Sequence, residues 1–294
     1  MRNLIIIGAS GLLGSELIKL FPDAIYTYNN TEIKHKNAYR LDITDQESLI
    51  SLLKRFEIRD IIVTSALTDV DKCEIYPDLA YKINADPFKY ITKYLKQVNG
   101  RLIQISTDYV FSGEQGNYSE EDFREPINVY GKSKKEAEDI ILDSGIEYAI
   151  IRTSGIFGIN KATGKTNFFL WIYNNLKENK EIYLVSDQYY SPTLNSILAR
   201  AIREIYDREI SGLIHFSSLD KISRLGFGYI VADIFGFDKN LIRETEMKDM
   251  KWKAKRPKDS SLNNEKAIKL LDEKPFTVFD EIKSIKLKSG FNEI

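Results

Sequence analysis

The chain has little of what extracellular, metal-binding or nucleic-acid-binding proteins need. Its 294 residues include one cysteine, Cys73, which excludes an internal disulfide and fits a reducing compartment. The two histidines, His35 and His215, have no histidine or cysteine neighbours at metal-ligand spacing, so we expect no metal site. The formal net charge is −1, from 42 basic and 43 acidic residues, and this balance gives no field to attract nucleic acid or an anionic membrane.

Long apolar runs are also missing. No run approaches the ~20 residues that a membrane-spanning helix requires. The N-terminal run at residues 4–7 is short and Gly8 follows it directly, so we expect no signal peptide. With 43% hydrophobic and 29% charged residues, the composition indicates a globular, cytoplasmic protein with one large α/β domain, alone or with a small lobe.

Short apolar runs alternate with amphipathic segments in the first half of the chain. We expect strands at 4–7, 24–28, 40–43, 61–63, 101–106 and 148–152, and helices at 12–20, 46–56, 79–95 and 130–142. Asp45 is expected to cap the second helix. This alternation predicts an α/β fold with a doubly wound parallel sheet. After Arg152 the pattern blurs, with helices near 168–176 and 194–206, which indicates a smaller, interleaved C-terminal lobe.

A glycine-rich turn joins the first expected strand to the first helix. Its residues are Gly8, Ala9, Ser10, Gly11, Leu12, Leu13 and Gly14. Gly8 permits a sharp turn, Gly11 lets backbone N–H groups approach a pyrophosphate, and Gly14 lets the helix pack closely on the sheet. A purely structural turn is the alternative, but the flanking strand and helix favour a dinucleotide. We therefore expect a Rossmann-type dinucleotide-binding domain over 1–152. Residues 153–294 would form mainly a substrate-binding lobe, with some segments returning to the first domain.

The residues after the second strand bear on which dinucleotide is bound. NAD-specific sites usually have an acid there that binds the ribose 2′-OH, whereas this chain has Asn29 and no acid before Glu32. Because Lys34 and Lys36 follow, the site favours NADP(H), with NAD(H) also compatible; a solvated loop is an equal alternative for the lysines. Asp42 is placed to accept a hydrogen bond from the adenine amino group, and residues 65–68 to line the ribose and nicotinamide.

Tyr130 and Lys134 lie four residues apart, on one face of an expected helix. A nearby ammonium lowers the pKa of a tyrosine. Tyr130 would then protonate a substrate oxygen as hydride arrives at carbon, and Lys134 would hold the nicotinamide ribose. Such a pair alone is more often a surface aromatic beside a solvated lysine. A hydroxyl of Ser106 or Thr107, at the end of an earlier strand, supplies a third element. Together they predict a nicotinamide-dependent enzyme acting at a carbonyl or alcohol.

These motifs resemble those of the extended short-chain dehydrogenase/reductases, and more closely those of the dTDP-4-dehydrorhamnose reductase family. The matching segments are residues 8–14, 41–45, 65–74, 83–85, 105–111, 130–134, 152–154, 187–188, 191–193 and 256–257. The most specific is Ser-Thr-Asp-Tyr-Val-Phe at 106–111. Sugar-nucleotide dehydratases have a glutamate after the Thr-Asp pair, where this chain has Tyr109, so we do not expect elimination of water.

The resemblance implies roles for individual residues. Thr107, Tyr130 and Lys134 would form the catalytic triad, and Asn84 would support the lysine through water. With the motifs above, the expected cofactor contacts are Gly8, Ser10, Gly11, Leu12, Leu13, Gly14, Asn29, Asp42, Ile43, Ala66, Leu67, Thr68, Tyr130 and Lys134. The expected substrate contacts are Thr107, Asp108, Gly155 and Arg256. The implied reaction reduces the 4-keto group of a nucleotide-linked 6-deoxyhexose, converting dTDP-4-dehydrorhamnose to dTDP-L-rhamnose.

One position departs from the family pattern. The family usually has a tryptophan after Arg-Thr-Ser that packs against the sugar, whereas this chain has Gly155. Loss of that aromatic platform would cost about 1 kcal/mol or more of binding free energy. An aromatic side chain from the lobe, at Phe169, Tyr189 or Tyr190, is a candidate replacement, and a different sugar is the alternative. Arg256 has two equal interpretations, a contact with a diphosphate and a loop salt bridge.

Two other functions are compatible with the same scaffold. One is a non-catalytic, NADP-binding regulatory subunit, since the beta subunit of methionine adenosyltransferase resembles this family; the intact Thr107, Tyr130 and Lys134 favour an enzyme instead. The other is a sugar-nucleotide epimerase, whose usual Val-Tyr-Gly ending is replaced here by Phe-Ser-Gly at 111–113. The expected partner is a small-molecule nucleotide sugar, and a homodimer would be common in the wider superfamily.

Overall fold

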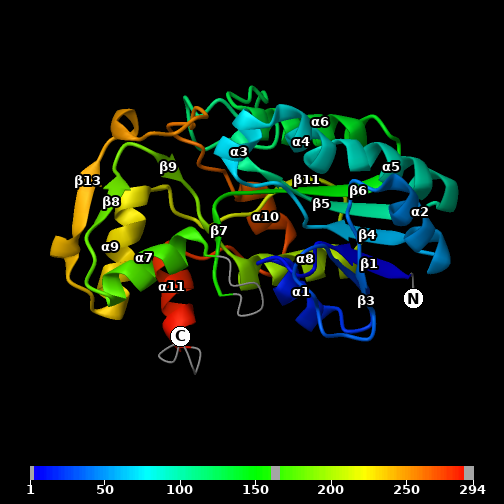
Figure 1. The fold of residues 1–294 in the computed structure, drawn as a ribbon, viewed down its shortest axis with the longest axis horizontal. Helices are drawn as coiled ribbons and strands as arrows, with labels where there is room; N and C mark the ends of the chain where they lie inside the picture. The colour runs from blue at the N-terminus through cyan, green and yellow to red at the C-terminus, as the bar shows by residue number, and fades with distance from the viewer. Residues whose placement is uncertain (1–2, 160–165, 288–294) are drawn as a thin grey trace.

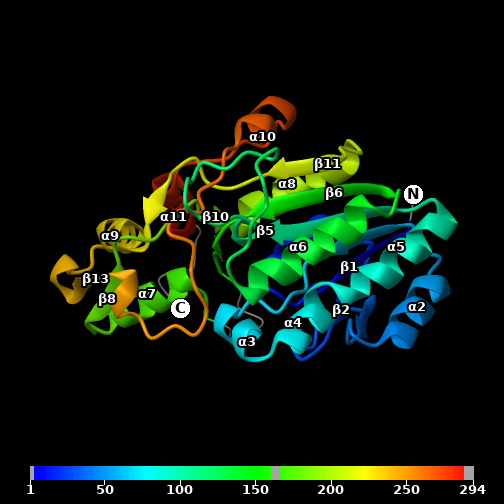
Figure 2. The same ribbon diagram turned by 90° about the horizontal axis from the view of Figure 1, so that it is seen from above.

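The computed structural model of the chain describes residues 3–159 and 166–287. Within these residues the centre is a parallel sheet of seven strands in the order β3-β2-β1-β4-β5-β6-β11, with helices on both faces (Figure 1, Figure 2). The strands are β1 (Leu4–Ile7), β2 (Ile25–Tyr28), β3 (Ala38–Arg40), β4 (Asp60–Val63), β5 (Arg101–Thr107), β6 (Glu147–Thr153) and β11 (Gly212–His215). The predicted doubly wound α/β fold is confirmed. The strand order reverses between β1 and β4, where ligands bind in such sheets.

Successive side chains along the strands enter two different hydrophobic cores. The helices concerned are α1 (Gly14–Leu20), α2 (Gln46–Arg55), α5 (Asp86–Val98), α6 (Val129–Leu142) and α8 (Asn195–Asp207). In β1, Ile6 packs in the core with α1 and α8, whereas Ile5 and Ile7 pack in the core with α2, α5 and α6. Because both faces of the sheet are covered, its strands read as continuous apolar runs in the sequence.

Most segment boundaries lie within one or two residues of the sequence-based expectation, and two segments differ more. The single helix expected at 79–95 is two helices, α4 (Pro77–Asn84) and α5, which follow the short α3 (Val70–Ile75). Pro87 lies in the first turn of α5 and has no N–H to continue the hydrogen bonds of α4. Strand β3 ends at Arg40, so Asp42 does not end a strand. Its carboxylate instead closes a turn by accepting hydrogen bonds from the N–H and hydroxyl of Thr44, each at 2.9 Å.

The second half of the chain forms a lobe and also returns to the sheet. The lobe contains β8 (Ile182–Val185) paired with β13 (Ile242–Thr245), and α7 (Phe168–Lys177), α9 (Arg224–Phe235) and α11 (Val278–Leu287) (Figure 1). One hydrophobic core runs from the lobe to the sheet. The division into 1–152 and 153–294 stays a prediction, and residues 1–2, 160–165 and 288–294 of those ranges lie outside the described residues. None of the helices described is long and apolar enough to cross a membrane.

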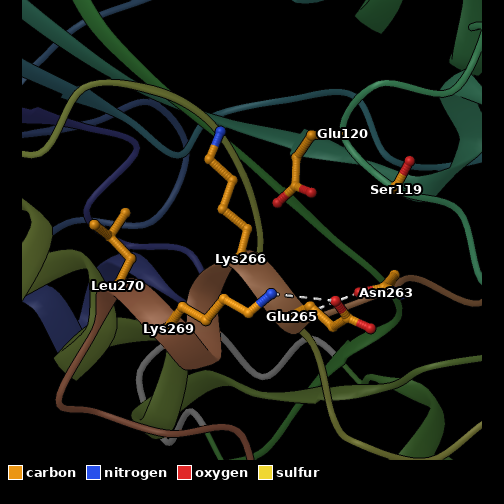
Figure 3. A pocket seen from close by; sticks show the side chains of 7 residues that line it. All are labelled: Ser119, Glu120, Asn263, Glu265, Lys266, Lys269 and Leu270. Carbon is orange, nitrogen blue, oxygen red and sulfur yellow. Dashed lines mark hydrogen bonds and ion pairs between the residues drawn. The ribbon is translucent and has the colours of Figure 1, made fainter.

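Side chains close the outer edge of the sheet at β11. Lys266 Nζ donates to the Leu213 carbonyl at 2.6 Å, and His215 N–H donates to Glu120 Oε1 at 2.7 Å. Glu120 and Lys266 also line a surface pocket of about 480 Å³ beside α10 (Glu265–Leu270), shown in Figure 3. These bonds occupy strand groups that could otherwise pair with another chain. Two of the residues that line the pocket, Glu120 and Lys266, thus also cover the exposed edge of β11.

His215, at the end of β11, is completely buried between polar partners. Its Nδ1 lies 2.9 Å from the Tyr118 carbonyl, and Nε2 lies 3.2 Å from Arg152 Nη1. Because a carbonyl can only accept and a guanidinium can only donate, the proton is on Nδ1 and Nε2 accepts. Burial, and next the charge of Arg152, lower the pKa of His215 to about 3. The histidine is thus neutral in the folded protein.

We expect His215 to make the folded state sensitive to acid. An unfolded histidine titrates at about pH 6.5, so between pH 6.5 and about 3 only the unfolded chain binds this proton. The free energy of unfolding therefore falls by up to about 1.4 kcal/mol for each unit by which the pH is lowered in this range. Urea unfolding at pH 7 and pH 5 measures the fall. His215→Gln should remove it, whereas the control His35→Gln should not. The same pH dependence in all three proteins would contradict this origin.

Candidate active site

The glycine turn lies between β1 and α1 and is shaped by close backbone contacts. Gly8 has φ +87°, and a Cβ there would lie 2.6 Å from Ser65 N. A Cβ on Gly14 would lie 2.5 Å from the Gly8 carbonyl oxygen, so α1 can approach β1 only without a side chain. Gly11 is exposed, and among the described residues no side chain caps the start of α1. The open helix N-terminus and bare backbone fit a dinucleotide pyrophosphate.

The other expected cofactor positions follow the carboxyl ends of β1, β2, β3 and β4. Ser10, Leu12 and Leu13 belong to the glycine turn; Asn29 and Asp42 are exposed, Ile43 is buried, and Ala66, Leu67 and Thr68 follow β4. The structure brings these segments to one edge of the sheet. Their contacts with a cofactor stay a prediction.

Asn84 joins the segment after β4 to the helix of Tyr130. Its Oδ1 accepts the Leu67 N–H at 2.8 Å, and its Nδ2 lies 3.1 Å from the Leu67 carbonyl and 3.0 Å from Ser133 Oγ. Ser133 precedes Lys134 in α6, so Asn84 fixes the position of both segments. Its support of Lys134 through water stays a prediction.

Tyr130 and Thr107 meet where β5 ends and α6 begins. Asn128 caps α6 by accepting the Gly131 N–H at 2.8 Å, which places Tyr130 in the first turn. Burial raises the pKa of Tyr130 above its ordinary value, and a hydrogen bond with Thr107 opposes the shift. The expectation that the Lys134 ammonium lowers this pKa is therefore wrong for this structure, because burial outweighs the other effects. The Tyr109 ring meets the Tyr130 ring nearly edge-on, with centroids 5.8 Å apart. The Tyr130 phenol and the Thr107 hydroxyl thus lie within hydrogen-bond distance of each other.

Asp108 lies beneath Thr107, with 2% of its surface exposed. It accepts hydrogen bonds from Thr107 Oγ1 at 2.9 Å, Ser154 Oγ at 2.6 Å and Ser260 Oγ at 2.5 Å. Burial raises the pKa of this carboxyl, and the three hydroxyls counteract the rise. Asp108 therefore ties together the ends of β5 and β6 and the C-terminal segment. Its contact with substrate stays a prediction.

Lys134 is buried one turn after Tyr130 on α6. Its Nζ donates to the Ile105 carbonyl at 2.8 Å, and within the described residues there is no hydrogen bond from Lys134 to Tyr130. Burial lowers the pKa of Lys134 to about 8, although the nearby carboxylate of Glu138 acts in the opposite direction. The ammonium thus lies close to the site, where burial disfavours its charged form. Oxygen atoms of a bound ligand would stabilise the charged form.

A fully buried ion pair fixes α6 against the sheet. Glu138 and Arg152, with side chains 0% and 1% exposed, are joined by Arg152 Nη2 to Glu138 Oε2 at 2.8 Å. Ser106 Oγ donates to Glu138 Oε1 at 2.5 Å, and Arg124 Nη1 to Oε2 at 3.0 Å. Since Ser106 precedes Thr107 and Glu138 lies one turn after Lys134, the pair sets the distance between the hydroxyl and the helix.

Gly155, where the family has an aromatic residue, is packed against Tyr190. Gly155 has φ +47°, and a Cβ there would lie 2.6 Å from Tyr190 Cε2. Of the three aromatics considered above, the structure therefore places Tyr190 beside Gly155. Phe169 is fully buried in the core of the lobe, and Tyr189 is half-buried beside Lys221.

Sequence reasoning missed Arg224, the first residue of α9. Its guanidinium carbon lies 3.7 Å above the Tyr190 ring, and its Nε donates to Gln188 Oε1 at 3.4 Å. The antiparallel pairing of β9 (Tyr189–Tyr190) with β12 (Ile222–Ser223) brings these residues together. No periodic pattern in the sequence announces such a contact between distant segments.

Arg256 forms the loop salt bridge that was one of its two interpretations. Its Nη2 lies 3.0 Å from Asp71 Oδ1, at the start of α3, and its Nη1 donates to the Ala254 carbonyl at 3.1 Å. A contact of Arg256 with substrate stays a prediction. Within the part of the chain that is described, no group of three or more histidine, cysteine, aspartate and glutamate side chains could hold a metal ion.

The model of the RmlD substrate binding domain family matches residues 1–285. The chain belongs to this family. A dTDP-4-dehydrorhamnose reductase of Aggregatibacter actinomycetemcomitans is 31% identical over 276 residues, which cover 90% of this chain and 91% of the relative. The family assignment confirms the resemblance drawn from the sequence motifs.

Solved structures of the family agree with the fold. One, from Sulfolobus tokodaii and described as a hypothetical dTDP-4-dehydrorhamnose reductase, is 39% identical, with a TM-score of 0.85 over 96% of this chain and 99% of the other. The dTDP-4-dehydrorhamnose reductase of Bacillus anthracis in complex with NADP is 26% identical, with a TM-score of 0.85 over 98% and 100%. Methionine adenosyltransferase 2 subunit beta of Rattus norvegicus is also similar, 25% identical over 89% of this chain and 80% of the relative.

We expect Gly155→Ala to lower the free energy of unfolding by more than the strain of a left-handed backbone conformation accounts for. A left-handed φ costs a non-glycine residue roughly 1–2 kcal/mol, and the clash with Tyr190 adds roughly 1–3 kcal/mol. Gly236→Ala is the matched control, because Gly236 has φ +76° with nothing within 4 Å of its Cβ position. Calorimetry should show a larger fall in Tm for Gly155→Ala than for Gly236→Ala. In a protein that already carries Tyr190→Ala, the further fall caused by Gly155→Ala should shrink to that of the control, because the clash is gone. Equal falls for the two alanines would mean that no clash exists.

Proposed function

We propose that this protein reduces the 4-keto group of a nucleotide-activated 6-deoxyhexose, converting dTDP-4-dehydrorhamnose to dTDP-L-rhamnose. NADPH is the preferred donor in this proposal, and NADH is compatible. One observation carries this proposal. Thr107, Tyr130 and Lys134 lie together at the carboxyl edge of the sheet, on the side where the glycine turn leads into α1, a helix whose start has no side-chain cap. The reductase names of the relatives, and the NADP in the Bacillus anthracis complex, support the same reaction and donor.

Each residue has a distinct task in the proposed reduction. The dinucleotide, when bound, supplies the hydride. Residues 8–14 would hold its pyrophosphate and Lys134 its nicotinamide ribose, whose hydroxyls would offset the desolvation of the ammonium. Tyr130 donates the proton to the sugar oxygen at C4, and Thr107 positions the phenol through their hydrogen bond. Residues 1–152 would thus bind the dinucleotide, and 153–294 mainly the sugar nucleotide.

Removal of the Tyr130 hydroxyl tests the proton donor. NADPH and NADH oxidation is followed by absorbance with dTDP-4-keto-6-deoxyglucose and a 3,5-epimerase that supplies dTDP-4-dehydrorhamnose. General acid catalysis contributes roughly 10²–10⁴-fold, so Tyr130→Phe should lower kcat by at least about 100-fold. Tyr148→Phe, at the opposite end of the sheet, is the control. No turnover by the wild type despite tight NADPH binding would overturn the rhamnose assignment. It would favour another keto-sugar, given Gly155, or the regulatory-subunit alternative that the methionine adenosyltransferase relative keeps open.

The pKa of Lys134 predicts how cofactor affinity depends on pH. Because that pKa is lowered to about 8, the ammonium is charged at pH 7 and loses its proton as the pH rises through 8. At pH 9 only about a tenth of the free protein keeps the charge, so the apparent Kd for NADPH should rise by up to about tenfold between pH 7 and pH 9. Lys134→Met should bind weakly at both pH values, whereas the exposed control Lys132→Met should resemble the wild type. A wild-type Kd that does not change would contradict this role.

A further inference from the structure

Arg224 is a half-buried cation whose charge is felt by the buried Asp108, although no ion pair joins it to an acidic side chain within residues 3–159 and 166–287. Its guanidinium lies over the ring of Tyr190 and 5.0 Å from the ring centre of Phe168. Its Nε makes a long hydrogen bond, 3.4 Å to Gln188 Oε1, and the guanidinium also has a side-chain hydrogen bond with Tyr190. Burial disfavours this charge, but Tyr190, Tyr109 and Asp108 favour it and the pKa of Arg224 is raised, so the guanidinium stays charged within the site.

Arg224 is connected to the reacting groups through side chains. Gln188, which receives the Arg224 hydrogen bond, donates from Nε2 to the Tyr109 hydroxyl at 3.4 Å. The Tyr109 ring in turn contacts Tyr130. Two side chains, Gln188 and Tyr109, therefore connect Arg224 to Tyr130.

The other arginine of this region is already engaged. Arg256 has its two terminal nitrogens on Asp71 Oδ1 and the Ala254 carbonyl, and its side chain is 11% exposed. Arg224 stacks through the face of its guanidinium, which leaves the terminal N–H groups that are not bonded to Gln188 or Tyr190 for another partner. Helix α9 also begins at Arg224, so the positive end of its dipole adds to the same field.

We propose that Arg224 binds the diphosphate of the sugar nucleotide, with Tyr190 holding the guanidinium in place. This inference rests on the proposed function. In a hexopyranose the diphosphate is attached to C1, across the ring from C4. A site that protonates the C4 oxygen at Tyr130 therefore needs its cation about one sugar ring away. The planar guanidinium can give two parallel hydrogen bonds to phosphoryl oxygens, which a lysine cannot.

Binding of dTDP to the NADP⁺-saturated protein, measured by calorimetry, tests the proposal. Arg224→Gln should raise the Kd for dTDP at least tenfold, which corresponds to about 1.4 kcal/mol. Arg224→Lys should give a smaller loss that grows with salt concentration, because a point charge replaces a bidentate contact. Affinity for NADP⁺ and for thymidine should stay unchanged in both variants, which shows that the fold and the base contacts are intact. Arg256→Gln is the matched arginine control and should weaken dTDP less than Arg224→Gln.

The outcomes separate this inference from the proposed function. If the wild type reduces the keto-sugar but Arg224→Gln binds dTDP as tightly as the wild type, the diphosphate assignment is wrong and the reductase stands. A larger loss in Arg256→Gln would likewise overturn the assignment in favour of Arg256. If the wild type binds NADP⁺ but neither binds dTDP nor turns over the keto-sugar, both fail together. Equal losses of thymidine and dTDP affinity in Arg224→Gln would also overturn it, since the diphosphate would then not be the group that is recognised.

Discussion

The arrangement of this site depends on the buried ion pair between Glu138 and Arg152. The two side chains are withdrawn from water, and the carboxylate is satisfied further by Ser106 and Arg124. Loss of one partner from such a pair typically costs about 3–5 kcal/mol, because the other charge is left buried. Through these bonds α6 is held against β5 and β6, and Arg152 extends the network to His215 on β11. Tyr130 and Thr107, the proposed catalytic phenol and hydroxyl, are therefore positioned through the ion pair that holds α6 against the sheet.

The site has two sides of different origin. The sheet and α6 supply the proposed catalytic groups, Thr107, Tyr130 and Lys134, which lie at the end of one strand and on one helix. The lobe supplies Tyr190, Gln188 and Arg224, which face the same region from β9 and α9. Since one hydrophobic core runs through both parts, the lobe side of the site is held by the same packing as the sheet.

The sequence predicted those features whose cause is local. Alternating apolar runs gave the sheet, the glycine turn marked the start of α1, and Asp45 was correctly expected to cap α2, where it accepts the Ser48 N–H at 3.0 Å. Boundaries failed where one residue interrupts a pattern, as Pro87 does between α4 and α5. The packing of Tyr190 on Gly155 and the position of Arg224 could not be foreseen, because the pairing of β9 with β12 creates them between segments far apart in the chain.

The place of β11 has a consequence for synthesis on the ribosome. Strand β6 pairs with β5 on one side and with β11 on the other, yet residues 154–211 are made between β6 and β11. During that interval the growing chain presents β6 as an open edge, with the unpaired backbone groups that recruit other strands. Pairing of β11 with β6 covers this edge and thereby removes the risk of pairing with other chains. Slow translation of residues 154–211 would prolong the time for which the edge is open.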